Sequence, residues 1–459
     1  MSRPASEKNG VDVISAIQRA GIVGCGGAGF PTHAKLKGDI HHLILNGAEC
    51  EPLLRTDRYL MIHHAAQIVS AATAVKQAVG AQQCTIALKG SYQEEIASLE
   101  RAIREQDAPI SIHKMKSFYP AGDEQVIVAE VTQQVIPPAG IPLDVGCVVS
   151  NVGTMYNIAL ALEGKNVTHK YLTVSGMVKK PTVICVPLGT SFAQCPELAG
   201  GIPEGDWMAI AGGPMMGRRL TRDQALEASV IKTTSGILIL PIDSLPARKE
   251  QITLLHMYQR ARSSCIQCRR CTDLCPRHLL GHPLEPHRIM RQMATLALDG
   301  NTTDSRILKS AALCCECGIC ETFACPMQLQ PRRVNAMLKQ ELAREKVRWN
   351  KGEGQQEPSL WREGRKAPTK RVAARAGVLE YYDRCGTAGL MQETPDQVTL
   401  PLRQHIGAPP TVLVTVGEQV SAGQLIAAAP EGALSANLHA SIDGVVVSVG
   451  DAIVIRKEG

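Results

Sequence analysis

Residues 1–160 alternate between short continuous apolar runs and stretches in which apolar residues recur at helical spacing. The runs at 42–46 and 84–88 are typical of buried strands. Helical spacing comes after each of them, over 61–75 and over 91–106. Strands that alternate with helices in this way predict an α/β domain with a largely parallel sheet.

Two later regions have the pattern of β structure. Alternating residues over 171–175 and 182–186 predict a hairpin inside a smaller module over residues 161–245. In the last region, 396–459, short apolar runs are separated by glycines, which predicts an all-β module.

The region between these modules is predicted to be helical. Over residues 250–348, Ile289, Met293 and Leu296 share one face of a predicted helix. The apolar face of a second predicted helix consists of Val334, Met337, Leu338 and Leu342. Residues 349–395 contain a stretch rich in Gly, Gln, Pro and basic residues, which predicts a solvated linker.

The composition narrows the class of protein. The chain has 459 residues, of which 44% are hydrophobic and 20% charged, so several domains with real cores are expected. No apolar run reaches eighteen residues and no signal peptide is recognisable, so we expect a cytoplasmic protein without a membrane span. A net charge of +6 and only 3% aromatic residues give little support for a nucleic-acid partner.

Eight of the sixteen cysteines form two runs, each of which ends in Cys-Pro. The first run has the spacing C-x2-C-x2-C-x3-C and the second has C-x2-C-x2-C-x4-C. Three thiolates two residues apart can surround one [4Fe–4S] cluster, while the cysteine before the proline binds the other cluster in two-cluster ferredoxins. The alternative, zinc, usually takes separated Cys-x2-Cys pairs and has no use for a third cysteine in one run.

Crossing the fourth ligands predicts two sets of cluster ligands. The first set is Cys265, Cys268, Cys271 and Cys325, and the second set is Cys275, Cys314, Cys317 and Cys320. Cys315 is expected to bind neither cluster. The extra residue before the last cysteine of the second run is expected to be absorbed in a turn.

A glycine loop near the N-terminus is the second candidate site. Residues 24–29 contain the pattern G-x-G-x-x-G, which in dinucleotide-binding folds comes after a strand and opens a helix. Here a helix is predicted before the loop, and Phe30-Pro31 interrupts any helix after it, so an ordinary Rossmann loop is disfavoured. The open backbone still suits a phosphate or a flat ring, and a tight turn without a ligand is the alternative.

Four motifs carry a resemblance to a known family. They are GCGGAGFPTHAK at 24–35, NGAECEP at 46–52, YPAGDE at 119–124 and SNVGTMYN at 150–157. Together they resemble the FMN-carrying, NADH-oxidising subunit of respiratory complex I and its relative, the C subunit of the Rnf electron-transport complex. The resemblance implies FMN as a cofactor and NADH as a substrate.

The same resemblance implies the residues of the flavin site. Those expected to hold the FMN phosphate and ring are Gly24, Gly26, Gly27, Gly29 and Lys35. Those expected to line the same site are Asn46, Glu49, Asn151 and Thr154. Glu51, Tyr119 and Asp123 are expected to shape the flavin and nicotinamide pocket, although Asp123 stands where complex I has glutamate.

The later modules extend the resemblance. Residues 161–245 are similar to the soluble-ligand-binding β-grasp domain of this family. Two roles stay open for this domain: it binds a ligand, or it only docks a partner. GGPMMG at 212–217 matches the Rnf-type branch, and PLRQHIG at 401–407 matches the start of the barrel-sandwich hybrid of the Rnf C subunit. In that subunit the barrel is N-terminal, whereas here it is C-terminal.

The resulting order of domains resembles the cobalamin reductases of propanediol-utilisation bacterial microcompartments. The resemblance implies NADH-dependent reduction of cob(III)alamin to cob(II)alamin and on to cob(I)alamin, for adenosylation and coenzyme B12 recycling. The implied partners are a cob(I)alamin adenosyltransferase and microcompartment shell proteins, and the implied location is inside a microcompartment. Two alternatives stay open: an Rnf-like electron-input subunit of a membrane-associated complex, and a non-enzymatic electron-transfer or docking protein.

Overall fold

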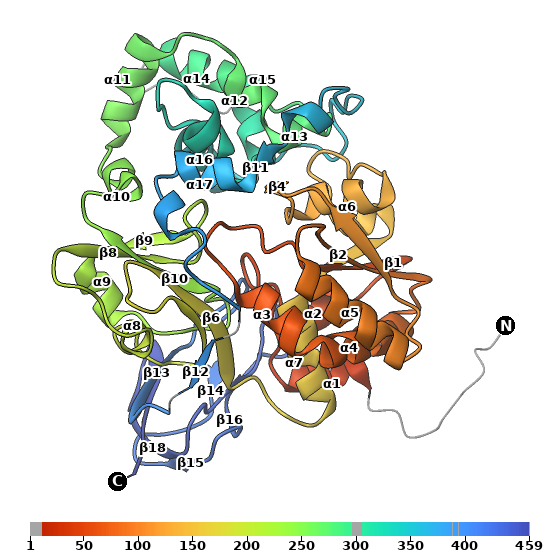
Figure 1. Ribbon diagram of the computed structural model, residues 1–459, viewed down its shortest axis with the longest axis vertical. Coiled ribbons are helices and arrows are strands. Elements are labelled where there is room, and N and C mark those ends of the chain that lie inside the picture. Colours follow the sequence, from red (N-terminus) through yellow and green to blue (C-terminus); the bar gives the residue numbers. More distant parts are fainter. Residues whose placement is uncertain (1–11, 296–304, 388, 393, 459) are drawn as a thin grey trace.

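The computed structural model describes residues 12–295, 305–387, 389–392 and 394–458. An α/β domain, a β-rich domain, a helical module and a C-terminal β module succeed one another along the chain (Figure 1). The helical module and the C-terminal β module lie at opposite ends of the molecule, with the other two between them (Figure 1).

The first domain is built on a parallel sheet with the strand order β3-β2-β1-β5. Its strands are β1 (His42–Asn46), β2 (Gln83–Lys89), β3 (Ser111–Met115) and β5 (Cys147–Asn151). Leu43, Ile44 and Leu45 of the central strand β1 are fully buried, because helices cover both faces of the sheet. The predicted α/β alternation is therefore confirmed.

Helices of the first domain agree with the predicted pattern with one difference. They are α1 (Val13–Arg19), α2 (Thr32–Lys35), α3 (Thr56–His63), α4 (Ala65–Val79), α5 (Gln93–Glu105), α6 (Glu124–Thr132) and α7 (Val152–Leu162). The apolar stretch predicted as one helix becomes two, since His64 leaves the helical conformation and packs its ring 4.6 Å from that of Tyr156. Gly80, with φ of +69°, ends α4.

The second domain has a six-stranded sheet in the order β12-β7-β6-β10-β8-β9. Its strands are β6 (His169–Gly176), β7 (Thr182–Pro187), β8 (Trp207–Ala211), β9 (Arg218–Leu220), β10 (Gly236–Pro241) and β12 (Leu390–Gln392). Strands β6 and β7 pair antiparallel, which confirms the predicted hairpin. Helices α8 (Gln194–Leu198) and α9 (Arg222–Glu227) complete this domain.

The third module is helical, as predicted. Its helices are α10 (Leu245–Glu250), α11 (Leu254–Ser264), α12 (Arg270–Asp273), α13 (Pro276–Leu279), α14 (Pro286–Thr295), α15 (Arg306–Lys309) and α16 (Pro331–Arg344). Ile289 of α14 and Val334 and Leu338 of α16 lie in one buried cluster, which holds these two helices together. Leu296, predicted on the same face as Ile289, lies outside the described residues.

The segment predicted as a solvated linker differs from that expectation. Strand β11 (Ala367–Pro368) pairs antiparallel with β4 (Phe118–Tyr119) of the first domain. In the next helix, α17 (Thr369–Arg375), Val372 and Ala373 are fully buried. The few apolar residues among the many charged ones therefore pack against the other modules. Residues 367–375 form a strap between the modules, next to α16 in Figure 1.

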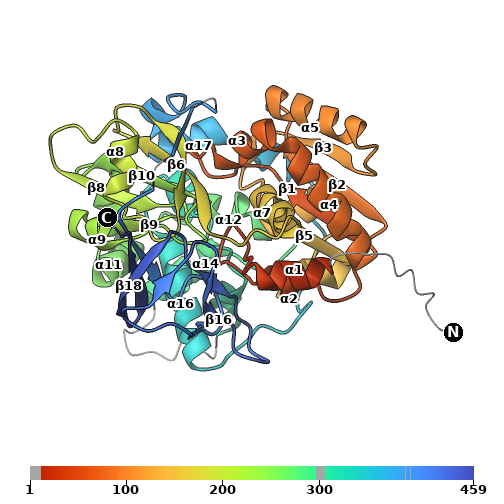
Figure 2. The ribbon, with the colours of Figure 1, turned by 90° about the horizontal axis from the view of Figure 1, so that it is seen from below.

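The C-terminal module consists of two small antiparallel sheets, ordered β13-β19-β18-β15 and β14-β16-β17. Its strands are β13 (Gln397–Pro401), β14 (Thr411–Val412), β15 (Gln419–Val420), β16 (Leu425–Ala428), β17 (Leu438–His439), β18 (Gly444–Val449) and β19 (Ala452–Arg456). Seen from below, it lies beside α1 and α2 of the first domain (Figure 2). The buried Lys232 joins three modules there, because its ammonium donates to the carbonyls of Gly21 (2.7 Å) and Asn437 (2.5 Å).

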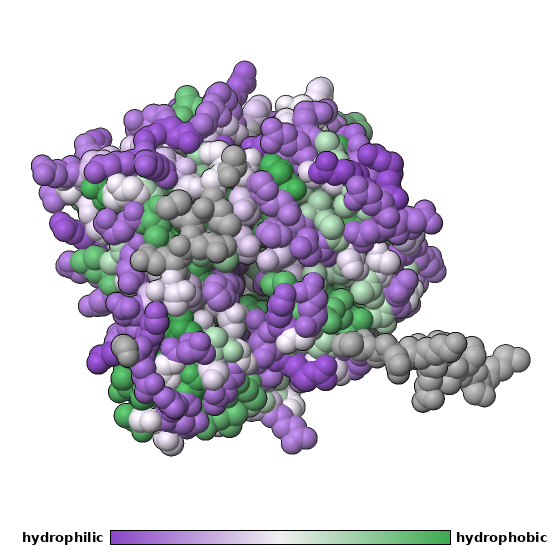
Figure 3. Space-filling view, turned by 60° about the horizontal axis from the view of Figure 1, so that its bottom comes forward, coloured by the Kyte–Doolittle hydropathy of each residue, from purple (hydrophilic) through white to green (hydrophobic). Residues whose placement is uncertain are grey.

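The face of the molecule in Figure 3 is mostly hydrophilic, with hydrophobic side chains in small separate patches. Among the helices that the structure describes, none combines the length and the apolar character needed to cross a bilayer.

Candidate functional site

A cavity of about 660 Å³ opens where β1 and β5 end side by side. The carboxyl ends of neighbouring parallel strands are the usual place for a ligand in an α/β sheet. Every residue predicted to hold or contact the flavin lines this cavity, with the exception of Gly29. The volume is in the range of sites that bury a cofactor-sized molecule.

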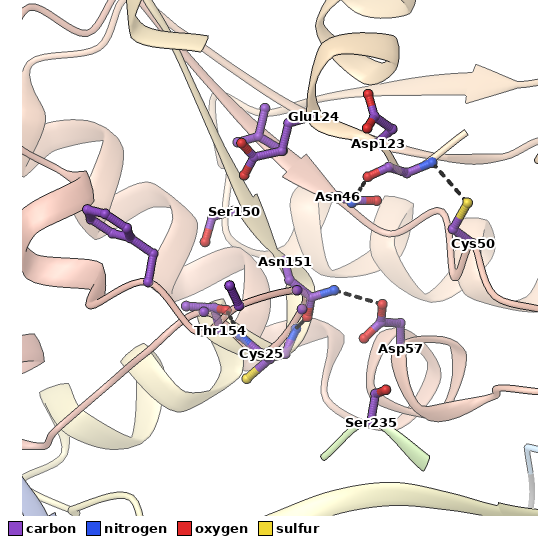
Figure 4. A pocket seen from close by; sticks show the side chains of 18 of the residues that line it. Cys25, Asn46, Cys50, Asp57, Asp123, Glu124, Ser150, Asn151, Thr154 and Ser235 are labelled. Carbon is purple, nitrogen blue, oxygen red and sulfur yellow. Dashed lines mark hydrogen bonds between the residues drawn. The ribbon is translucent and has the colours of Figure 1, made fainter. Parts of the chain in front are cut away.

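The glycine loop forms one wall of the cavity with bare backbone. At Gly26 and Gly27 an added Cβ would meet no atom within 4 Å, and Gly27 has φ of +66°. The backbone N–H of Cys25 donates to the Thr154 hydroxyl at 3.0 Å, which fixes the loop on α7 (Figure 4). This open wall fits a phosphate or a flat ring placed against the backbone.

Gly29 lies outside the cavity lining and has a packing role. Its φ is +70°, and a Cβ there would lie 2.5 Å from the side chain of Thr233 and 3.4 Å from His405. Glycine at this position lets the loop contact the second domain and the C-terminal module closely.

Three lysines, Lys35, Lys37 and Lys170, line the cavity and give it positive charge. Lys35 forms an ion pair with Glu124 at the rim. Lys170, from β6 of the second domain, is only 6% exposed and lines the same cavity. Within the described part of the chain its ammonium forms no hydrogen bond or ion pair, and its charge acts on the Asp57 carboxyl, whose pKa it lowers against the effect of burial. An anionic group of a ligand would add a direct partner for this charge.

Polar side chains fix the strand ends around the cavity (Figure 4). Asn46 donates to the carbonyl of Gly122 at 2.9 Å, and Asn151 donates to the carboxylate of Asp57 at 2.8 Å. The N–H of Asp57 in turn donates to Glu49 at 2.6 Å. Burial, and then the charge of Asp57, raises the pKa of Glu49 to about 8, while burial raises the pKa of Asp57 to about 6.

Glu51 is held by the GGPMMG segment of the second domain. Its carboxylate accepts hydrogen bonds from the N–H groups of Met215 and Met216, both at 2.9 Å. A Cβ at Gly213 would lie 2.3 Å from the side chain of Glu51, so only glycine allows this approach. Burial raises the pKa of Glu51 to about 7 in spite of these donors.

Asp123 is engaged by the helical module. Both of its carboxylate oxygens accept hydrogen bonds from the Arg277 guanidinium, at 2.5 Å and 2.9 Å. The same carboxylate caps α6 through the N–H groups of Gln125 and Val126. Arg277 is two residues from Cys275, so this largely buried pair ties the rim of the cavity to one of the predicted cluster ligands.

The second cysteine run borders the cavity directly. Cys315 and Cys317 are among the lining residues, and the hydroxyl of Tyr119 donates to the carbonyl of Cys317 at 2.6 Å. Tyr119, Met215 and Cys317 belong to one buried apolar cluster. The other predicted ligands are absent from the cavity lining.

The thiols of the first predicted set lie near one another. Burial raises the pKa of the Cys271 thiol to about 12, and three neighbouring thiols raise it further. These neighbours are Cys325, Cys265 and Cys268. The fourth thiol beside this set, Cys325, thus belongs to the other run, which is the arrangement expected for a two-cluster ferredoxin.

The second predicted set is gathered in the same crossed manner. Burial raises the pKa of the Cys320 thiol, and the neighbours that add to the rise are Glu321, then Cys314 and Cys275 of its own predicted set, and last Cys271 of the first set. Cys317 also has Cys320 as a neighbour. No three His, Cys, Asp or Glu side chains of the described ranges stand close enough to share a single metal ion, whereas the ligands of a cluster reach it from separate corners.

The extra residue of the second run lies in a π-helical turn, Cys320–Ala324. The N–H of Cys325 donates to the carbonyl of Cys320, five residues earlier, at 3.1 Å. In the first run α12 occupies this place with ordinary four-residue spacing, where Leu274 donates to Arg270 at 3.1 Å. A π turn accommodates one inserted residue while it leaves both ends in register.

Comparison with known proteins gives the family. Four family models match: a Nuo51 FMN-binding domain at 17–160, an SLBB domain at 171–219, a 4Fe-4S dicluster domain at 264–330 and an RnfC barrel sandwich hybrid domain at 390–459. The chain is 40% identical over 452 residues to cobalamin reductase PduS of Salmonella typhimurium, covering 98% of this chain and 97% of that protein. The chain belongs to the PduS cobalamin reductase family.

Other relatives agree with this placement. Cobalamin reductase PduS of Citrobacter freundii is 40% identical over 445 residues, which cover 96% of each chain. The proton-translocating ferredoxin:NAD(+) oxidoreductase complex of Clostridium ljungdahlii has a C subunit that is 33% identical, over 61% of this chain and 58% of that protein. The predicted fold class is confirmed, and the chain contains an FMN-binding domain and a 4Fe-4S dicluster domain.

Sequence reasoning missed several residues of the cavity. Asp57 and Lys170 line it but lie outside the quoted motifs, and Glu124 lines it as the last residue of the motif at 119–124 without having been predicted as a contact. Only the isolated positive charge in the β-rich pattern of 169–176 could have pointed to Lys170. Cys315, expected to bind no cluster, lines the cavity beside Cys317.

Proposed function

We propose that this chain is an NADH-dependent flavin and iron–sulfur cobalamin reductase. It reduces cob(III)alamin to cob(II)alamin and on to cob(I)alamin, which adenosylation then converts to coenzyme B12. The observation that carries the proposal is the direct contact between the flavin-type cavity and the second cysteine run, through Tyr119 and Cys317, in a member of the PduS family.

FMN is the proposed occupant of the cavity, with Lys35, Lys170 and the backbone at Gly26 and Gly27 as its main contacts. The bare glycine wall and the buried Lys170 ammonium support this assignment, since they suit a flat ring and an anionic group. When bound, FMN takes two electrons as hydride and gives them up singly, and iron–sulfur clusters carry single electrons.

The surrounding residues fix the shape of the cavity wall and set the electrostatic environment of the cavity. Asn46, Asn151 and Thr154 hold the cavity wall through hydrogen bonds to backbone and side chains. Glu49 and Asp57 share a buried site in which one carboxyl can keep its proton near neutral pH. Because the acceptor cobalt takes electrons alone, the proton that arrives with the hydride has to leave the cavity, and the carboxyls of Glu49 and Asp57 would take it up.

Two [4Fe–4S] clusters are proposed on the crossed sets. The thiol neighbours of Cys271 and of Cys320 support the crossing. Protein purified without oxygen is expected to contain about eight iron atoms per chain. Stoichiometric zinc without iron in such a preparation would contradict the proposal.

The flavin site is tested by Lys35→Ala and Lys170→Met. Loss of a charged hydrogen-bond donor is expected to weaken FMN binding by about 10- to 150-fold, the equivalent of 1.5–3 kcal/mol. FMN affinity is measured by fluorescence titration of flavin-depleted protein, with the exposed Lys179→Met of the same domain as control. Unchanged affinity in both variants, or release of FAD in place of FMN, would refute the assignment.

The activity is tested anaerobically by monitoring corrinoid absorbance with NADH. We expect cob(II)alamin to form from cob(III)alamin, and cob(I)alamin to be withdrawn only when an adenosyltransferase is present. NADH oxidation with ferricyanide but with no corrinoid would favour the Rnf-like alternative, and no NADH oxidation would favour the non-enzymatic one. We also propose, from the family alone, the transferase and shell proteins as partners and a microcompartment as the location.

A further inference from the structure

The two predicted cluster sites differ in their distance from the flavin-type cavity. Residues of the second run line that cavity, whereas every other predicted ligand is absent from its lining. Cys275, Cys317 and Cys320 of the second set are buried. If the proposed function holds, electrons that leave the cavity reach the second set first and the first set afterwards.

The first set comes to the surface. Cys268 is exposed, and the neighbouring Ile266 is 62% exposed, although both belong to the loop that wraps the predicted cluster. Neither the flavin-type cavity nor the small second cavity contains any residue of 265–270. The loop is therefore a projecting contact surface and not a pocket for a small ligand.

This surface is basic. Arg262, Arg269 and Arg270 are exposed around Cys268, and Asp273 is the acidic neighbour, 3.3 Å from Arg269. No ion pair of Arg270 occurs within the described residues. An exposed isoleucine among arginines has the composition of a small transient interface in which charge directs the encounter.

We propose that a one-electron acceptor protein with an acidic surface docks on this face, defined by Arg262, Ile266, Cys268, Arg269 and Arg270. The redox group of this acceptor then approaches the first set of predicted cluster ligands, which is the outer cluster site. The arginines orient the acceptor through long-range electrostatic attraction. The reductant stays in the cavity on the far side of the second set. Donor and acceptor thus need not compete for one opening.

Binding is tested without NADH, so that the readout does not depend on turnover. Oxidised plastocyanin, an acidic one-electron acceptor, and oxidised cytochrome c, a basic one, serve as probes at low ionic strength. Plastocyanin is expected to bind, with a Kd that rises at least tenfold in Arg270→Glu and in Ile266→Asp and that rises with salt. Cytochrome c is expected to show no such loss.

Two control variants match the charge change of Arg270→Glu and the side-chain exposure of Ile266. Lys457→Glu reverses an exposed charge in the C-terminal module, at the other end of the molecule (Figure 1). Val416→Asp changes an aliphatic residue that is 64% exposed, close to the value for Ile266. Both are expected to leave the Kd of plastocyanin unchanged, and iron content verifies that each variant retains its clusters.

Turnover then separates docking from the proposed function. The rate of NADH-dependent plastocyanin reduction should fall at least tenfold in Arg270→Glu, while the ferricyanide rate stays within twofold. Equal rates for Arg270→Glu and Lys457→Glu, or an equal loss with both protein probes, would overturn the docking proposal. Failure of the unmodified protein to reduce corrinoids would refute the proposed acceptor but would leave the plastocyanin result intact.

Discussion

The two cysteine runs have similar backbone conformations, but the first run is the more exposed, whereas the second run is mostly buried. Gln267 and Arg269 of the first run have φ of 53° and 65°, and Glu316 and Gly318 of the second have 58° and 76°. Each run thus turns twice through the left-handed region, just before and just after its second cysteine. The spacing of the cysteines sets this local path, since three thiols must face one centre.

The environment of each run depends on which distant segments of the chain pack against it. The second run packs against the second domain and borders the cavity, and there the left-handed position after the second cysteine is Gly318. The first run is exposed, and the equivalent position is Arg269, an amino acid for which this conformation is strained. One ligand motif can therefore serve as an inner or an outer electron site, depending on which segments cover it.

The largest expected effect comes from removing one cluster ligand of each set. Cys317→Ser is expected to leave no cluster reducible by NADH, because the inner site is lost, whereas Cys268→Ser should leave one. Iron is expected to fall from about eight to about four per chain in both. Low-temperature EPR of the NADH-reduced proteins measures the difference.

Cys315→Ser is the matched control for the inner run, since Cys315 lies between two predicted ligands without belonging to a set. It should keep about eight iron atoms per chain. Loss of iron in this variant, or identical EPR spectra for Cys317→Ser and Cys268→Ser, would break the inner and outer assignment.

The next largest effect is expected at the Asp123–Arg277 ion pair, which ties the cavity rim to Cys275, a predicted ligand of the inner cluster set. Arg277→Met leaves the partly buried carboxylate of Asp123 without its cation, which should destabilise the folded protein by about 2–3 kcal/mol. Urea unfolding monitored by circular dichroism measures it. Arg288→Met, which removes an exposed pair with Glu285, should cost about 1 kcal/mol or less, and equal losses would contradict the argument.

Glu51, beside the inner run, is expected to give a pH-dependent effect of about 3 kcal/mol. Its folded pKa of about 7 lies above the ordinary 4.5, so the folded state binds more protons between these values. The stabilisation is complete below pH 4.5 and is lost as the pH rises through about 7. Glu51→Gln should remove this loss, so that the variant gains stability relative to the unmodified protein over that range.

Unfolding measured at several pH values between 4.5 and 8 provides the test. The exposed Glu197→Gln should show a pH-independent difference. A pH-independent difference for Glu51→Gln as well would show that the buried carboxyl does not keep its proton in the folded state.

The smallest expected effect concerns the left-handed positions themselves. Gly318→Ala should destabilise the protein by about 1–2 kcal/mol, because a Cβ is strained at φ of 76°. Arg269→Gly relieves the same strain and loses only an exposed ion pair with Asp273, so it should change stability by less than about 1 kcal/mol. A larger loss for Arg269→Gly than for Gly318→Ala would contradict the equivalence of the two positions.

Local pattern alone predicted much of the fold. The apolar runs of β1 and β2, the hairpin β6-β7 and the helices α14 and α16 form from residues close in sequence, whose periodicity reports which face is buried. The strap at 367–375 was missed because its buried residues are few and are surrounded by charges. Its partner strand β4 lies far away along the chain.

For the site, the sequence by itself determined the residue types: the glycine loop, the cysteine spacings and the motif residues that meet at one cavity. Tertiary structure alone decided that Lys170 enters that cavity from another domain, that Arg277 pairs with Asp123, and that only one cysteine run borders the flavin-type site. The reason is physical. Ligand geometry depends on short-range spacing, whereas burial, charge pairing and the order of redox sites depend on which surfaces distant segments cover.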